Sequence, residues 1–186
     1  MDATPLDGCS SKLELDTDTL DTLANQLLQR FSVPGMALGI IKDGAEWSGG
    51  WGATNVRYPL PVTSDTLFQT GSITKTATVT AVLRLVEQGL LDLDAPVVRY
   101  IPELRLSDSD VARRLTLMHL LTHSSGLPDL IEETGRGDDA LSAIVEKVAA
   151  LPLRSPLGES WSYSNVGYSL VGRVIEVVTG NLMRQL

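Results

Sequence analysis

Hydrophobic residues near the start of the chain recur at the spacing of an α-helix: Leu20, Leu23, Leu27, Leu28 and Phe31. Residues three and four positions apart lie on one face of a helix, so this pattern predicts an amphipathic helix that Val33-Pro34-Gly35 ends. Residues 1–19 are polar and acidic, and we expect them to form a flexible arm.

The next pattern is that of a β-hairpin. An apolar run of strand length, Met36 to Lys42, is followed by the dipeptide Asp43-Gly44 and by a second segment, Ala45 to Gly52. An Asp-Gly pair between two such segments favours a two-residue turn, which predicts an antiparallel pair of strands. In the connector 53–70 we expect at most one more short strand, at Thr66 to Gln69.

After residue 70 the pattern is helical. The spacing predicts helices from Ser72 to Gln88, near Pro96, from Leu115 to Thr122, from Ala140 to Ala150 and from Val166 to Thr179. The buried side of the first of these is expected to hold Ala77, Ala81, Val82, Leu85 and Val86. Strands segregated from helices favour an α+β fold over an alternating α/β fold.

This order gives one domain over residues 20–186, with a sheet portion at 20–70 and a helical portion at 71–186. Two or three strands make a sheet that is too small to cover these helices. We therefore expect a partial domain from which the C-terminal strands of the sheet are missing.

Composition narrows the class of protein. The chain has 186 residues, 43% of them hydrophobic and 20% charged, as in ordinary globular domains. Its net charge of -8 argues against a nucleic-acid partner, because such partners need a basic face. The single cysteine, Cys9, excludes an internal disulfide, and no apolar run reaches the roughly 18 residues of a membrane span. The N-terminus lacks the features of a signal peptide, which fits a cytoplasmic protein, or an exported mature form with an added Met1.

The candidate chemistry begins at the start of the predicted 72–88 helix. Ser72 and Lys75 are three residues apart, which places a hydroxyl and an amine on one helix face, about 5–6 Å apart at Cβ. A neutral amine there can take the proton of the hydroxyl, so the pair has the character of a nucleophile and its base. The unpaired N–H groups of a first helical turn can also hold a developing oxyanion. A Ser-x-x-Lys match also arises by chance, so the pair alone does not decide the function.

Tyr163 and Asn165 come just before the predicted 166–179 helix. A tyrosine hydroxyl can act as an acid, a base or a proton relay. Alternatively, Tyr163 is a core aromatic residue and Asn165 caps the helix. His119 and His123 have a spacing that can bind metal, but no Glu lies between them, so we expect a structural pair, no metal and no cofactor.

Together these motifs resemble a known family. Ser72-x-x-Lys75 followed by Tyr163-x-Asn165 resembles the serine β-lactamase and penicillin-binding-protein superfamily. The Tyr-x-Asn form is similar to class C β-lactamases, DD-peptidases of that branch and their esterase relatives. The resemblance covers about residues 20 to 183 and extends to the segments Leu83 to Val97, Leu120 to Pro128 and Pro156 to Tyr168.

The resemblance implies a role for each site residue. Ser72 would be the acylated nucleophile, with its backbone N–H as one oxyanion donor, and Lys75 would be its activating base partner. Tyr163 would carry the proton to the leaving group and later activate the deacylating water. Asn165 would hydrogen-bond the substrate amide or Lys75, and His123 would be structural.

The third motif of that family, Lys-Thr-Gly or a His-containing variant on a later strand, does not occur in this sequence. Two functions therefore stay open. The first is a serine hydrolase that acts through an acyl-enzyme on a small-molecule ester, amide or β-lactam carbonyl. The second is a truncated, catalytically incompetent fragment that acts as an interaction module, or as half of a split enzyme whose sheet a second chain completes.

Overall fold

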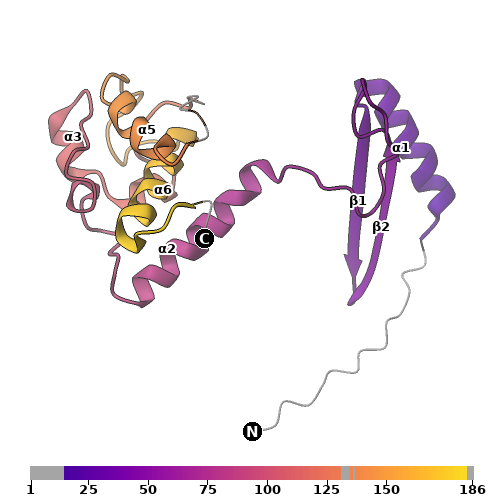
Figure 1. Cartoon of the computed structure of the whole chain (residues 1–186), viewed down its shortest axis with the longest axis horizontal. Helices are drawn as coiled ribbons and strands as arrows, with labels where there is room; N and C mark the ends of the chain where they lie inside the picture. The colour runs from indigo at the N-terminus through magenta and orange to yellow at the C-terminus, as the bar shows by residue number, and fades with distance from the viewer. Residues whose placement is uncertain (1–14, 131–134, 136, 184–186) are drawn as a thin grey trace, which may run out of the picture. The chain divides into compact units, whose positions relative to one another are not determined.

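A computed structural model describes residues 15–130, 135 and 137–183. The chain forms two compact units, residues 1–69 and 70–186 (Figure 1). Most of the expected N-terminal arm, residues 1–14, lies outside the described residues. None of the described helices combines the length and apolar character that a bilayer-spanning segment needs.

The first unit is a helix and a β-hairpin. Helix α1 (Thr17–Phe31) precedes the strands β1 (Gly35–Lys42) and β2 (Ala45–Gly52), which pair antiparallel from Lys42↔Ala45 to Gly35↔Gly52. Asp43 and Gly44 both have positive φ, as a two-residue hairpin turn requires. The Trp51 indole N–H donates to Asp21 Oδ1 over 2.7 Å, which ties the hairpin to α1. The predicted helix and hairpin are therefore confirmed.

Two details of the first unit differ from expectation. Helix α1 begins at Thr17, ahead of Leu20, because the Asp16 carboxylate accepts the Thr19 backbone N–H and caps the helix. Residues 17–19 are thus helical. Thr66–Gln69 forms no strand, because a turn precedes it in which the Thr66 N–H donates to the Thr63 carbonyl.

The second unit is helical. The one-turn 3₁₀ helix η1 (Gly71–Ile73) leads into α2 (Thr74–Glu87), and η2 (Val97–Arg99), α3 (Ser109–Arg114), α4 (Leu117–Leu121), α5 (Ala140–Val148) and α6 (Asn165–Thr179) follow. Helix α6 contacts α2, α4 and α5, of which α2 and α5 are labelled in Figure 1. Its Leu170, Val171 and Val174 are fully buried. Burial of apolar side chains such as these is the main favourable contribution to the folding free energy of the unit. The α+β element order that the sequence predicts is confirmed.

The helical pattern was misread in two places. Helix α3 was not predicted; Asp108 begins it by accepting the N–H groups of Asp110 and Val111, and Leu115 ends it. On α2, Ala77 is exposed and Thr78 is buried instead, because Thr78, Val82 and Leu85 form the row that faces the core. The Thr78 hydroxyl donates to the Thr74 carbonyl, which makes its burial tolerable.

The segment that follows α4 is clamped by backbone hydrogen bonds. The Gly126 carbonyl accepts the Arg154 N–H at 2.8 Å, the Ser124 carbonyl accepts the Gly158 N–H at 2.8 Å, and the His123 carbonyl accepts the Ser162 N–H at 2.8 Å. These bonds fix residues 154–162 beside residues 123–126. The residues that come next, from Tyr163 on, are held in place by this clamp.

Gly126 offers a test of the clamp. It has φ +73°, and a Cβ at this position would overlap the Ser155 carbonyl oxygen. Gly89 has nearly the same φ, +71°, but no atom near an added Cβ, so it is a matched control. We expect Gly89→Ala to cost about 1–2 kcal/mol for its left-handed backbone, and Gly126→Ala to cost clearly more. Thermal unfolding measures both; equal losses would show that position 126 is not tightly enclosed.

Candidate active site

Ser72 lies in the middle of η1, where the chain enters α2. Gly71 has φ +54°, a left-handed conformation that lets the chain turn sharply into the helix. The Ser72 side chain is exposed, and among the described residues its backbone N–H has no backbone partner. Such unpaired donors are the normal property of a first helical turn.

The structure brings the four candidate residues together. The hydroxyls of Ser72 and Tyr163 lie 2.6 Å apart, and Lys75 Nζ is 3.5 Å from Ser72 Oγ. Lys75 Nζ also donates to Asn165 Oδ1 over 2.7 Å. Tyr163 and Asn165 are thus neighbours of a serine and a lysine about ninety positions earlier in the chain.

Lys75 lies against two aromatic rings. Its Nζ lies 4.8 Å from the centre of the Tyr163 ring and 5.2 Å from the centre of the Tyr168 ring. The Tyr168 hydroxyl donates to the Leu121 carbonyl at 3.0 Å, which fixes its ring. The faces of both rings attract an ammonium group, so this position suits a lysine cation.

The charge of Lys75 acts on Tyr163. Hydrogen bonding from Lys75 is the main reason why the pKa of the Tyr163 phenol lies below its ordinary value; the hydrogen bond with Ser72 and then the positive charge of Lys75 lower this pKa further. Burial and the Asp129 carboxylate act in the opposite direction. For Tyr168, by contrast, burial raises the pKa of the phenol. Tyr163 is therefore the tyrosine of this pair that more readily becomes a phenolate.

Sequence reasoning missed Asp129. Its Oδ1 accepts both the backbone N–H of Asn165, at 3.1 Å, and the side-chain Nδ2 of Asn165, at 2.9 Å. The only signal for it was a carboxylate placed directly after the turn Gly126-Leu127-Pro128. Asn165 itself does not cap α6; Ser164 does, by accepting the Gly167 N–H at 3.0 Å.

His123 supports Tyr163 from one side. Its ring lies 4.5 Å from that of Tyr163 and 5.1 Å from that of Tyr168, and its Nδ1 accepts the Ser164 N–H at 3.1 Å. Burial, with the charge of Lys75, lowers the pKa of His123. A neutral imidazole is what this hydrogen bond requires, because a doubly protonated ring has no acceptor.

His119 has a different environment from His123. Its Nδ1 pairs with the Thr116 hydroxyl at 2.7 Å in the cap of α4. Within the described residues, no group of three His, Cys, Asp or Glu side chains is placed to hold a metal ion. The two histidines therefore belong to separate local structures, one at a helix cap and one against Tyr163.

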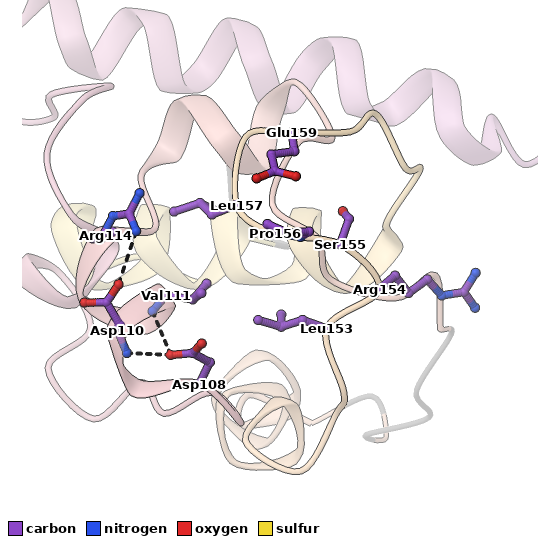
Figure 2. Close-up of a pocket in the computed structure, with 10 residues that line it drawn as sticks. All are labelled: Asp108, Asp110, Val111, Arg114, Leu153, Arg154, Ser155, Pro156, Leu157 and Glu159. Carbon is purple, nitrogen blue, oxygen red and sulfur yellow. Dashed lines mark hydrogen bonds and ion pairs between the residues drawn. The ribbon is translucent and has the colours of Figure 1, made fainter.

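A pocket of about 400 Å³ lies next to these residues. Lys75, Asn165 and Tyr168 form its polar side, and Leu130, Leu141 and Met183 contribute apolar surface. A second pocket, of about 500 Å³, is lined by α3 and residues 153–159 (Figure 2).

Three of the charged residues that line the second pocket, Asp108, Asp110 and Arg114, have structural roles. Asp110 forms an ion pair with Arg114, and Asp108 caps α3 (Figure 2). Asp110 also forms an ion pair with Arg113. None of the four candidate residues lines this pocket. The candidate active site is therefore the group around Ser72.

Comparisons with known proteins show the family of the chain. Residues 20–186 match the β-lactamase family. The chain belongs to the β-lactamase family. It is 39% identical over 149 residues to penicillin-binding protein 4 of Amycolatopsis lactamdurans, covering 80% of this chain and 39% of that protein. It is also 39% identical over 135 residues to esterase EstB of Burkholderia gladioli, covering 64% of this chain and 34% of that protein.

Solved structures of the family share the fold. The class C β-lactamase from Rhodobacter sphaeroides is 32% identical and superposes with a TM-score of 0.67, over 86% of this chain and 44% of that one. This confirms the family and the fold that the motifs implied. The chain spans about two fifths of the length of the relatives that it matches.

The electrostatic link between Lys75 and Tyr163 is testable. Lys75→Met removes the main cause of the lowered pKa, so we expect the pKa of Tyr163 to rise toward the ordinary tyrosine value. A pH titration of the phenol carbons by NMR measures it, with Tyr163→Phe to identify the signal. Lys147→Met, on α5, is the control and should leave the midpoint in place. An unchanged midpoint in Lys75→Met would contradict the link.

Proposed function

We propose that the protein is a serine hydrolase that forms an acyl-enzyme on Ser72. The observation that carries the proposal is the 2.6 Å contact between the Ser72 and Tyr163 hydroxyls beside the Lys75 amine. A nucleophile within hydrogen-bond reach of a group with a lowered pKa is the arrangement that covalent catalysis needs. The reaction class is acyl transfer to water.

The distances favour Tyr163 Oη, rather than Lys75 Nζ, as the atom that takes the proton of the Ser72 hydroxyl. Tyr163 Oη is 2.6 Å from Ser72 Oγ, whereas Lys75 Nζ is 3.5 Å away and donates to Asn165. In the proposed role, Lys75 is the cation that stabilises the Tyr163 phenolate. The family resemblance implies that Lys75 is the activating base partner of Ser72. The distances favour an indirect activation, in which Lys75 stabilises the Tyr163 phenolate and Tyr163 takes the proton.

The steps follow from this assignment. Ser72 Oγ attacks the carbonyl carbon as its proton moves to Tyr163 Oη, and the carbonyl oxygen becomes an oxyanion within reach of the Ser72 N–H. The bond to the leaving group breaks as Tyr163 returns the proton to it. Water then attacks the acyl-enzyme, Tyr163 takes the proton of the water, and Ser72 leaves with that proton.

The substrate class is an ester, amide or β-lactam of a small molecule. Family relatives are named as a penicillin-binding protein, an esterase and β-lactamases, which together span these three kinds of carbonyl. The pocket beside Lys75 offers an apolar wall from Leu130, Leu141 and Met183. This supports an acyl group with an apolar part.

A fluorophosphonate probe tests the nucleophile. We expect one adduct on Ser72 by intact-mass and peptide analysis, none on Ser72→Ala, and an unchanged adduct on the matched control Ser142→Ala of α5. Tyr163→Phe should slow labelling by about 10²–10⁴-fold, as for the loss of a general base. Absence of an adduct on the wild-type chain would overturn the proposal and favour the alternative of a non-catalytic interaction module or half-enzyme.

The labelling rate should also depend on pH. Tyr163 acts as a base only when deprotonated, so the rate rises as pH increases through the lowered pKa of Tyr163. Lys75→Met raises that pKa, so the rise should move to higher pH. A labelling rate that is flat from neutral to alkaline pH would contradict Tyr163 as the base.

A further inference from the structure

The side-chain amide of Asn165 lies between a cation and an anion. Its Oδ1 accepts from Lys75 Nζ at 2.7 Å, and its Nδ2 donates to Asp129 Oδ1 at 2.9 Å. An amide has an acceptor at one end and two donors at the other. Rotated by half a turn, it would set its NH₂ against the Lys75 ammonium and its oxygen against the Asp129 carboxylate. Asp129 therefore selects the orientation in which Asn165 can hold Lys75.

The backbone that precedes Asp129 is buried and hydrogen-bonded. Asp129 follows Leu127 and Pro128, both buried, and the Pro128 carbonyl accepts the Ser164 hydroxyl at 3.0 Å. The same Asp129 Oδ1 also accepts the Asn165 backbone N–H at 3.1 Å. One oxygen atom thus fixes both the backbone and the side chain of Asn165.

We propose that Asp129 is a positioning residue, which acts through Asn165 to hold Lys75 beside Ser72 and Tyr163. The effect of Asp129 on acyl transfer rests on the proposed function. Its hydrogen bond with the Asn165 side-chain amide does not depend on that function. The Asp129 side chain is exposed, so its charge is screened by water and its contribution comes mainly from geometry. Misplacement of a catalytic group by about 1 Å costs on the order of 10²-fold in rate.

Asp129 also belongs to the charges that act on Tyr163. The groups that act on this phenol are Lys75 from α2, the Ser72 hydroxyl and Asp129, while the rings of His123 and Tyr168 pack nearby. Lys75 and Ser72 lower the pKa of Tyr163, and the Asp129 charge raises it. Removing that charge while keeping the hydrogen bond would lower the pKa further.

Two substitutions separate the hydrogen bond from the charge. Asp129→Ala removes the acceptor, and Asp129→Asn removes the charge but keeps an oxygen that can accept from Asn165. Asp108→Asn is the matched control, because Asp108, like Asp129, accepts two N–H groups at a helix start, in its case the backbone N–H groups of Asp110 and Val111 in α3. Thermal unfolding of each variant establishes that it is folded.

The first readout does not depend on activity. Hydrogen exchange of the Asn165 side-chain NH₂, followed by NMR and assigned with Asn165→Ala, reports the contact with Asp129 directly. We expect at least about tenfold faster exchange in Asp129→Ala, a smaller change in Asp129→Asn and none in Asp108→Asn, since a lost hydrogen bond exposes the amide to water. Equal exchange in Asp129→Ala and the wild type would overturn the proposal.

The second readout is the rate of fluorophosphonate labelling across pH. We expect Asp129→Ala to be about 10- to 100-fold slower than the wild type. Asp129→Asn should stay within a few-fold, with the rise in rate moved to lower pH. A residue that only stabilised the start of α6 would leave the pH profile of labelling unchanged. Wild-type labelling rates and pH profiles in both Asp129→Ala and Asp129→Asn would therefore overturn the proposed effect of Asp129 on acyl transfer. If the wild type takes no label, the proposed function fails, and the amide measurement still decides the proposal.

Discussion

The site depends on one buried side chain, that of Ser164, which is 1% exposed. Its hydroxyl donates to the Pro128 carbonyl and accepts the Gly167 N–H, and its own backbone N–H donates to His123. A buried residue with three satisfied hydrogen bonds, two through its hydroxyl and one through its backbone N–H, is costly to move, because each lost bond would leave a polar group unpaired. Ser164 therefore joins the 123–128 segment to the start of α6 and fixes the residues on either side of it.

The backbone at Ser164 explains why the two candidate site residues beside it, Tyr163 and Asn165, are separated by one position. Ser164 is extended, with φ −143° and ψ 114°. Neighbouring side chains of an extended segment point to opposite sides, so Tyr163 and Asn165 share the side that Ser164 does not use. Ser72 and Lys75 share a face through the other periodicity, that of a helical turn. The site forms where a helix face meets one side of an extended segment.

These two periodicities are local, which is why the sequence predicts them. The spacing of Ser72 and Lys75, the Asp43-Gly44 turn and the long helix at the end of the chain depend on residues close together in sequence. Asp129 was missed, and Tyr168 was noted only as part of a family-like segment, because the contacts of both reach partners thirty or more positions away. Helix α3 escaped notice because its six residues are too few for a hydrophobic repeat to appear. Long-range partners at this site could be inferred only through the family resemblance.

The two helix starts at the site have opposite properties. At α6 the protein uses the free donors itself: Ser164 accepts the Gly167 N–H and Asp129 accepts the Asn165 N–H. At η1 and α2 no side chain caps the start, and Thr70 and Ile73 are helical in backbone conformation. Partial positive charge at a helix start is therefore neutralised beside Asn165 and left available beside Ser72. If Ser72 attacks a carbonyl, as we propose, the oxyanion would develop beside this start without a side-chain cap, and the partial positive charge there would stabilise it.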